Sequence, residues 1–252
     1  MNIFFYWDAG ENDAPLVVRS CLNKWRDNFG DAIRFVSKVE AETIVSEHVA
    51  SFNYLPKQVF ADILRLALLY RYGGLWVDAT VMPHNDIPRI NDIIRLEDKV
   101  KVFNAPFGKR PCANWMISAP KGNRLIGAWL TFYAEYWCDF RLPASQAPLL
   151  TKIGFKATIA IEPSILVSPT WREVLRYFPY FACHYSLRHL TKKDPSLLSE
   201  LKILPYDYDA VARALTNGDA SCLPPLVKLS WRSKKIDSYL RIFSGEDIFV
   251  TT

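Results

Sequence analysis

Apolar residues follow a helical period between residues 56 and 72, and the pattern then changes within two positions. The apolar side chains of this stretch recur every three or four residues, at Phe60, Ile63, Leu64, Ala67 and Leu68. That spacing is typical of a helix with one buried stripe. Pro56 suits the first turn, and Gly73 and Gly74 suit the end, where a left-handed residue is needed. The pattern predicts a helix over about residues 56–72.

A short apolar run follows the two glycines. Leu75, Trp76 and Val77 are bulky and too few for another helix, so they predict a strand buried on both faces. Asp78 stands at the C-terminal end of that strand. Because ligands bind outside the carboxyl ends of strands in open α/β sheets, Asp78 is the first candidate for a functional residue.

Two charged residues of the predicted helix add to this candidate. Asp62 and Arg65 are three positions apart, so they share one helix face and could simply form an ion pair. The same helix leads directly into the strand that ends at Asp78. The rigid fork of donors on an arginine also suits hydroxyls and phosphates, so a ligand contact is the second interpretation.

The rest of the chain supports an α/β fold. Strands are predicted over residues 2–7 and 32–36, and helices from Asp13 onward and over residues 41–49. With the elements above, these make a β-α-β-α-α-β order, which is typical of a mainly parallel sheet flanked by helices. Further elements are predicted over residues 100–104, 114–118 and 123–138, and prolines interrupt the pattern beyond about residue 140. We expect one domain over residues 1–252.

Composition narrows the class of protein. With 252 residues, half of them apolar, the chain can bury a large core. The net charge of +5 is spread out and no recognition motif is present, so a nucleic-acid partner is not expected. The charge does allow weak attraction to anionic lipid headgroups.

The chain shows no sign of secretion or of a membrane span. Its five cysteines have no metal or redox spacing, which favours reduced thiols and a cytoplasmic location. The N-terminus lacks a secretory signal, and no apolar run is long enough to span a membrane.

The chain lacks the motifs of several enzyme classes. The Gly-x-Gly-x-x-Gly fingerprint and the P-loop are absent, which disfavours a dinucleotide-binding enzyme, and no Ser-His-Asp or Cys-His arrangement is evident. Val77 to Val81 resembles the nucleophile strand of haloacid-dehalogenase-type phosphatases. That chemistry needs a second acid two positions after the first, and Thr80 stands there instead.

The helix and strand around the double glycine resemble a known family signature. Phe60-Ala61-Asp62-Ile63-Leu64-Arg65, continued by Tyr72 to Asp78, resembles the core of glycosyltransferase family 32 enzymes, which carry a DXD sugar-binding motif. More narrowly, three segments resemble the bacterial capsular polysaccharide synthesis protein family: Trp76 to Val81, Asn114 to Pro120 and Lys228 to Trp231.

The resemblance implies a GT-A type glycosyltransferase fold and a sugar transfer. The donor would be a nucleotide sugar, expected to be a UDP-sugar. The acceptor would be a growing surface glycan, either capsule or the O-antigen of lipopolysaccharide, free or lipid-linked, and the anomeric configuration would be retained. Peripheral contact with the inner face of the membrane is a further expectation.

The resemblance also assigns roles to residues. Asp62 and Arg65 would contact the donor sugar, and Asp78 would approach the ribose and the metal. Trp7, after the first strand, would stack on the nucleotide base, although core packing is its alternative reading. Two further residues are expected to bind the donor: Asn114, and Trp231 at the leaving phosphate. The alternative reading of Asn114 is a hydrogen bond to backbone at a strand start, and that of Trp231 is a buried C-terminal anchor.

One position departs from the family pattern. The second carboxylate of the DXD motif, the usual direct ligand of Mn²⁺ or Mg²⁺, is Thr80 here, and a hydroxyl is a poorer ligand for such a cation. Either another acid such as Asp86 completes the metal site, or Arg and Lys side chains neutralise the diphosphate instead. Thr80 also leaves open a catalytically degenerate fold that serves as a binding or assembly subunit. The intact Asp62, Arg65 and Asp78 favour an enzyme.

Overall fold

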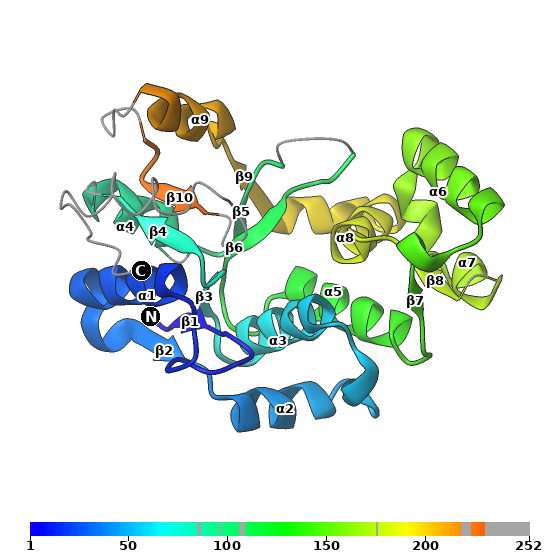
Figure 1. Cartoon of the computed structure of the whole chain (residues 1–252), viewed down its shortest axis with the longest axis horizontal. Coiled ribbons are helices and arrows are strands. Elements are labelled where there is room, and N and C mark those ends of the chain that lie inside the picture. The colour runs from blue at the N-terminus through cyan, green and yellow to red at the C-terminus, as the bar shows by residue number, and fades with distance from the viewer. Residues whose placement is uncertain (85–86, 96, 106–108, 175, 218–222, 230–252) are drawn as a thin grey trace, which may run out of the picture.

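A six-stranded mixed sheet forms the centre of the protein (Figure 1). The computed structural model describes residues 1–84, 87–95, 97–105, 109–174, 176–217 and 223–229. The strand order is β2-β1-β3-β6-β5-β9. Five strands run in one direction, and β6 is antiparallel to both of its neighbours. The strands are β1 (Ile3–Phe5), β2 (Ile33–Phe35), β3 (Gly74–Val77), β5 (Val100–Phe103), β6 (Ala113–Ala119) and β9 (Leu201–Leu204).

Helices cover both faces of this sheet. The helices are α1 (Leu16–Phe29), α2 (Lys38–Ser46), α3 (Lys57–Tyr72), α4 (Ile87–Ile94), α5 (Arg124–Tyr136), α6 (Leu149–Ile161), α7 (Pro169–Val174), α8 (Ala182–Lys193) and α9 (Tyr208–Asn217). Alternate residues of the buried strands point to opposite faces, so Phe4 and Trp76 pack with α2, α3 and α5, whereas Phe5 and Val77 pack with α1 and α4. The mainly parallel, helix-flanked α/β class is therefore confirmed.

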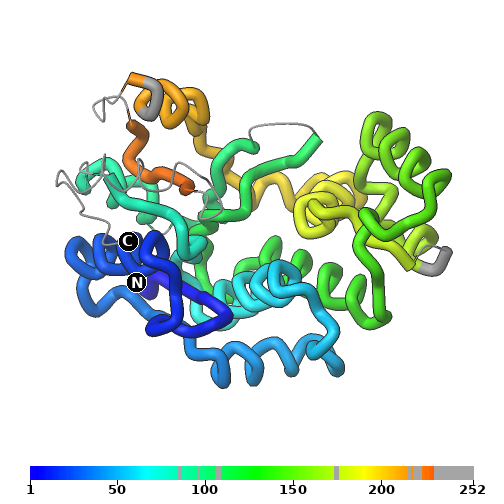
Figure 2. Tube along the Cα trace, viewed as in Figure 1, coloured from blue at the N-terminus to red at the C-terminus, as the bar shows by residue number. Residues whose placement is uncertain are grey.

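Two short strand pairs lie outside the main sheet. β4 (Val81–Pro83) pairs antiparallel with β10 (Leu226–Lys228), and β7 (Leu142–Pro143) pairs with β8 (Tyr177–Phe178). Figure 2 shows β10, from late in the chain, beside β4, from the first third. The figure also places α6 and α7 at one end of the long axis, away from the central sheet.

The predicted elements of the first half are present with shifted ends. The predicted helix at 56–72 is α3, with Pro56 as its N-cap and Gly73 as its C-cap. The helix predicted at 41–49 begins earlier, at Lys38, because the Ser37 side chain accepts a hydrogen bond from the Glu40 N–H and so caps it. Asp13 does not cap α1, whose N-cap is Pro15.

The double glycine is required by the close approach of backbones. Both glycines have positive φ, +65° at Gly73 and +116° at Gly74. A Cβ atom on Gly74 would collide with the backbone carbonyl oxygen of Asn2, next to the hydrogen bond from the Leu75 N–H to that same oxygen. The turn from α3 into β3 therefore tolerates no side chain at this point.

We expect Gly74→Ala to lower the free energy of unfolding by more than about 2 kcal/mol, because the substitution adds both backbone strain and a backbone clash. Gly154→Ala on α6 is the matched control. A Cβ there meets nothing within 4 Å. Because alanine favours the helix over glycine, this substitution should raise the free energy of unfolding by up to about 1 kcal/mol. Urea unfolding of both variants tests this expectation. Equal effects of the two substitutions would contradict it.

Candidate functional site

The carboxyl edge of the sheet brings together side chains that are far apart in the sequence. β1 and β3 are parallel, so Trp7 and Asp78 both follow strand ends at this edge. β6 runs the other way, so its first residues, including Asn114, lie at the same edge. A backbone hydrogen bond of 2.8 Å from the Asp78 N–H to the Trp115 carbonyl joins the two strands here.

Arg65 is the centre of the site. The guanidinium is buried, and its Nη2 lies 3.2 Å from a carboxylate oxygen of Asp62 and 3.2 Å from one of Asp78. Nη1 donates to the Asn114 carbonyl, and the guanidinium carbon lies 5.1 Å from the centroid of the Trp76 ring. The predicted Asp62–Arg65 ion pair is thus present. Because its N–H groups point to protein acceptors, Arg65 fixes the positions of the two carboxylates.

Asp62 is held by neutral donors as well. Its Oδ1 accepts a hydrogen bond of 3.0 Å from the Asn114 amide, and its Oδ2 accepts one of 3.4 Å from the Tyr133 hydroxyl. Asn114 therefore touches the cluster through both its backbone and its side chain. Tyr133 was not a sequence candidate, because as one aromatic among many on α5 it gives no signal beyond helix packing.

The two carboxylates differ in their acid strength. Burial raises the pKa of Asp62 to about 6, and the charge of Asp78 adds to the rise, while Arg65 opposes it. Burial acts on Asp78 in the same sense, but Lys228 and Arg65 outweigh it, and the pKa of Asp78 is lowered. Asp78 is thus a fixed negative charge, and Asp62 binds a proton more readily.

The place beside Thr80 is taken by an ammonium group. Lys228 Nζ donates to Asp78 Oδ2 at 2.7 Å and to Thr80 Oγ1 at 3.0 Å. A divalent cation would need several oxygen ligands there. In the part of the chain that the structure describes, no three acidic, histidine or cysteine side chains gather to hold a metal. The donor set of Asp78, Thr80 and a lysine does not fit Mn²⁺ or Mg²⁺.

Three other candidate residues have different outcomes. Trp7 packs against the cluster of Ala14, Val17, Val18, Ala79, Met82 and Val227, which places it on the same edge as Asp78. Trp231 and Asp86 lie outside the described residues. The structure therefore brings together Asp62, Arg65, Asp78 and Asn114, with Trp7 nearby.

A comparison with models of protein families identifies the family of this chain. Residues 1–145 match the model of the capsular polysaccharide synthesis protein family. The chain belongs to this family. The predicted membership is confirmed, and the matched region contains Trp7, Asp62, Arg65, Asp78 and Asn114. The narrower likeness to glycosyltransferase family 32, with its DXD motif, stays a prediction.

Individual relatives of this chain are distant. The O-glycosyltransferase braB of Annulohypoxylon truncatum is 24% identical over 157 residues, which are 54% of this chain and 37% of that protein. Among solved structures, the PaToxG glycosyltransferase is 13% identical with a TM-score of 0.39, over 75% of this chain and 86% of its own. The ligand-free glycosyltransferase domain of the YGT toxin is 12% identical with a TM-score of 0.38, over 71% and 54% of the two chains.

Lys228 is the functional candidate that sequence reasoning missed. It begins the segment Lys228 to Trp231, which resembles the family, so a signal was present. The lysine lies 150 positions after Asp78, however, and only the pairing of β10 with β4 brings the two side chains together.

The raised pKa of Asp62 predicts a pH effect on stability. The folded-state pKa of about 6 lies above the usual value of 3.8, so the stabilising contribution of the protonated form is lost as pH rises through 6. Between about pH 4 and pH 7.5, the free energy of unfolding of the wild type should fall by on the order of 2–3 kcal/mol relative to that of Asp62→Asn.

Chemical unfolding of both proteins at the two pH values measures this change. At low pH, the difference between the two free energies of unfolding reports how the amide changes the contacts of Asp62. The change of that difference with pH reports the effect of ionising the carboxyl group. A difference that stays constant, or that moves in favour of the wild type at high pH, would show that the Asp62 pKa is not raised.

Proposed function

We propose that this protein is a glycosyltransferase that moves a sugar from a nucleotide-sugar donor, expected to be a UDP-sugar, to a hydroxyl of a growing bacterial surface glycan. The observation that carries the proposal is the cluster of Asp62, Arg65, Asp78 and Asn114 at the carboxyl edge of the sheet. Carboxylates and an amide held rigidly at such an edge suit recognition of sugar and ribose hydroxyls. Family membership and the name of the relative, an O-glycosyltransferase, agree with this class of enzyme.

The reaction needs positioning and charge stabilisation. The bond between the anomeric carbon and the diphosphate oxygen breaks, and a bond from that carbon to the acceptor oxygen forms. The acceptor proton passes to the departing diphosphate, which leaves as the nucleoside diphosphate. Retention of configuration requires the acceptor to approach the same face that the diphosphate leaves. Negative charge then develops on the leaving oxygen, where a positive group must stand.

We assign a separate role in this reaction to each residue of the site. Arg65 holds the two carboxylates in place, since its donors are directed at protein oxygens. Asp62, together with Asn114, faces the hydroxyls of the donor sugar, and Asp78 approaches the ribose and the diphosphate. Trp7, after the neighbouring strand, stacks on the nucleotide base. In this division the GT-A type fold supplies the edge at which all of them meet.

The acceptor is proposed to be capsule or O-antigen glycan, carried on a lipid at the cytoplasmic side of the membrane. The family description supports a polysaccharide product. Within the described residues, no helix is both long and apolar enough to cross a membrane. Contact with a lipid-linked acceptor would then take place at the membrane surface.

A panel of sugar nucleotides tests the donor class. We expect the melting temperature of the protein to rise with at least one UDP-sugar, because a ligand that binds only the folded state stabilises it. With the same donor, Asp78→Asn should lower transfer or donor hydrolysis about 100-fold or more while the fold stays intact. Asp27→Asn, an exposed carboxylate on α1, is the control.

The outcomes separate the rival functions. No stabilisation by any nucleotide sugar would contradict the proposal. Stabilisation without turnover in the presence of glycan acceptors would identify a binding or assembly subunit instead. Unchanged turnover in Asp78→Asn would remove Asp78 from the site.

A further inference from the structure

The side chain of Lys228 occupies the position between Asp78 and Thr80. Its ammonium has three N–H donors, and two of them are directed at Asp78 Oδ2 and Thr80 Oγ1. Among the described residues no third acceptor is recorded for it. The Lys228 side chain is also partly exposed, so the site is open to a ligand on this side.

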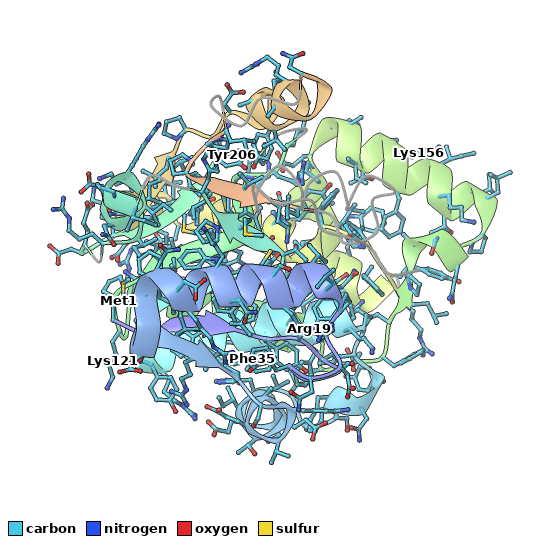
Figure 3. All side chains as sticks on the ribbon, turned by 60° about the vertical axis from the view of Figure 1, so that its left-hand side comes forward. Met1, Arg19, Phe35, Lys121, Lys156 and Tyr206 are labelled. Atoms are coloured by element: carbon cyan, nitrogen blue, oxygen red, sulfur yellow. The ribbon has the colours of Figure 1, made fainter. Side chains whose placement is uncertain are left out.

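The backbone of Lys228 is held firmly. Lys228 pairs with Val81 in the β10–β4 ladder, and the next N–H, from Leu229, donates to the Thr80 carbonyl at 2.9 Å. The Lys228 N–H lies 3.4 Å from the Tyr206 hydroxyl, and Figure 3 shows Tyr206 beside β10. The lysine is therefore attached to the strand pair that directly follows the Asp78 turn.

A diphosphate bound beside Asp78 would need a positive charge within reach of its oxygens. Asp62 and Asp78 are balanced by Arg65 and Lys228, so a bound diphosphate would add its negative charge beside Asp78. Arg65 is buried behind the carboxylates with its donors directed at protein oxygens. Lys228, on the exposed side, is the positive charge that a phosphate oxygen can meet.

We propose that Lys228 supplies the positive charge that stabilises the leaving diphosphate, in the position where a DXD enzyme would use a metal. Thr80 then orients the ammonium as a hydrogen-bond acceptor. A neutral hydroxyl does this without adding a second negative charge near the diphosphate. This inference rests on the proposed function and predicts transfer that does not depend on a divalent cation.

The test compares Lys228→Met, which keeps most of the stem and removes the charge, with wild type after treatment with a chelator. Binding of UDP and of uridine is measured by calorimetry, and turnover by donor hydrolysis. The chelator should leave wild-type turnover and UDP affinity unchanged within about twofold. Lys228→Met should lower turnover about 100-fold and weaken UDP binding, while uridine binding stays the same. Lys202→Met is the control, because Lys202 lies on β9 and forms an ion pair with Glu97 instead.

A second variant tests the replacement directly. Lys228→Met combined with Thr80→Asp restores two carboxylates, and UDP binding should then become dependent on Mn²⁺. Loss of wild-type activity with chelator, together with unchanged UDP affinity in Lys228→Met, would overturn the inference and leave the transferase proposal standing. Failure of every nucleotide to bind would overturn the proposed function itself.

An independent observation concerns the exposed face of α6. Four large apolar side chains on this helix are largely in solvent: Leu149, Leu150, Ile153 and Ile161. They recur at helical spacing with Ala157 and Ala160, while Phe155 is buried on the opposite side. Figures 1 and 3 show α6 at the periphery of the molecule, and Figure 3 labels Lys156 at its outer edge.

The charges around this face are positive. Lys152 and Lys156 are both exposed on α6, which contains no acidic residue. Lys109 contacts the carbonyls of Ala160 and Ile161 at the C-terminal end of the helix. The next acid along the chain, Glu162, is neutralised by Arg188 and Lys192.

The size of the face argues against a second copy of the chain. A helix of this length is about 20 Å long and about 10 Å wide, so it offers on the order of 200 Å², whereas a stable interface needs roughly 800 Å² from each partner. An apolar stripe flanked by lysines is instead the arrangement of a helix that lies in a membrane interface. We infer that α6 rests on a membrane surface containing anionic lipid.

Sedimentation with lipid vesicles tests this docking surface. Wild type should bind vesicles of phosphatidylcholine mixed with phosphatidylglycerol and should bind phosphatidylcholine alone more weakly. The double substitution Leu150→Glu and Ile153→Glu should weaken binding at least about tenfold. Lys152→Glu should weaken it about fivefold and reduce its salt dependence. Val39→Glu, an exposed apolar position on α2, is the control and should bind as wild type.

Equal vesicle binding by the α6 variants and wild type would contradict the inference. So would a dimer of the wild type, seen by light scattering without lipid, that the α6 substitutions dissociate. That second result would identify a copy of the chain as the occupant of this face.

Discussion

The buried guanidinium of Arg65 is the interaction on which the site depends. One nitrogen lies 3.2 Å from both Asp62 and Asp78, which belong to different elements, a helix and the end of a strand. A second nitrogen binds the carbonyl of Asn114, on a third element. Without this cation, two carboxylates would be buried side by side at considerable free-energy expense. The arginine therefore joins α3, β3 and β6 at one point, and the polar edge of the sheet exists because of it.

Much of this arrangement could be predicted from local pattern. The helical period of α3, the double glycine and the three apolar residues of β3 gave the order of elements and placed Asp78 at a strand end. Parallel strands then put Trp7 at the same edge. The reason is that buried strands and amphipathic helices are encoded by short-range periodicity, which a single sequence contains.

What could not be predicted depends on contacts between distant segments. The partner of Asp78 on β10 is found only through the β4–β10 pairing, and the role of Tyr133 depends on how α5 packs against α3. The start of α2 lies earlier than predicted because a serine cap outweighed the apolar period. Thr80 could be recognised as unusual from the sequence, yet its meaning required knowing that an ammonium stands beside it.

The separation of Asp78 and Lys228 has a consequence for how the chain assembles. During synthesis the nascent chain presents Asp78 long before the segment of β10 has been made, since 150 positions separate the two. Without β10, the cation that contacts Asp78 is Arg65, which also pairs with Asp62. The pairing of β10 with β4 brings the second positive charge to Asp78, so forming this strand pair and completing the electrostatics of the site are one event.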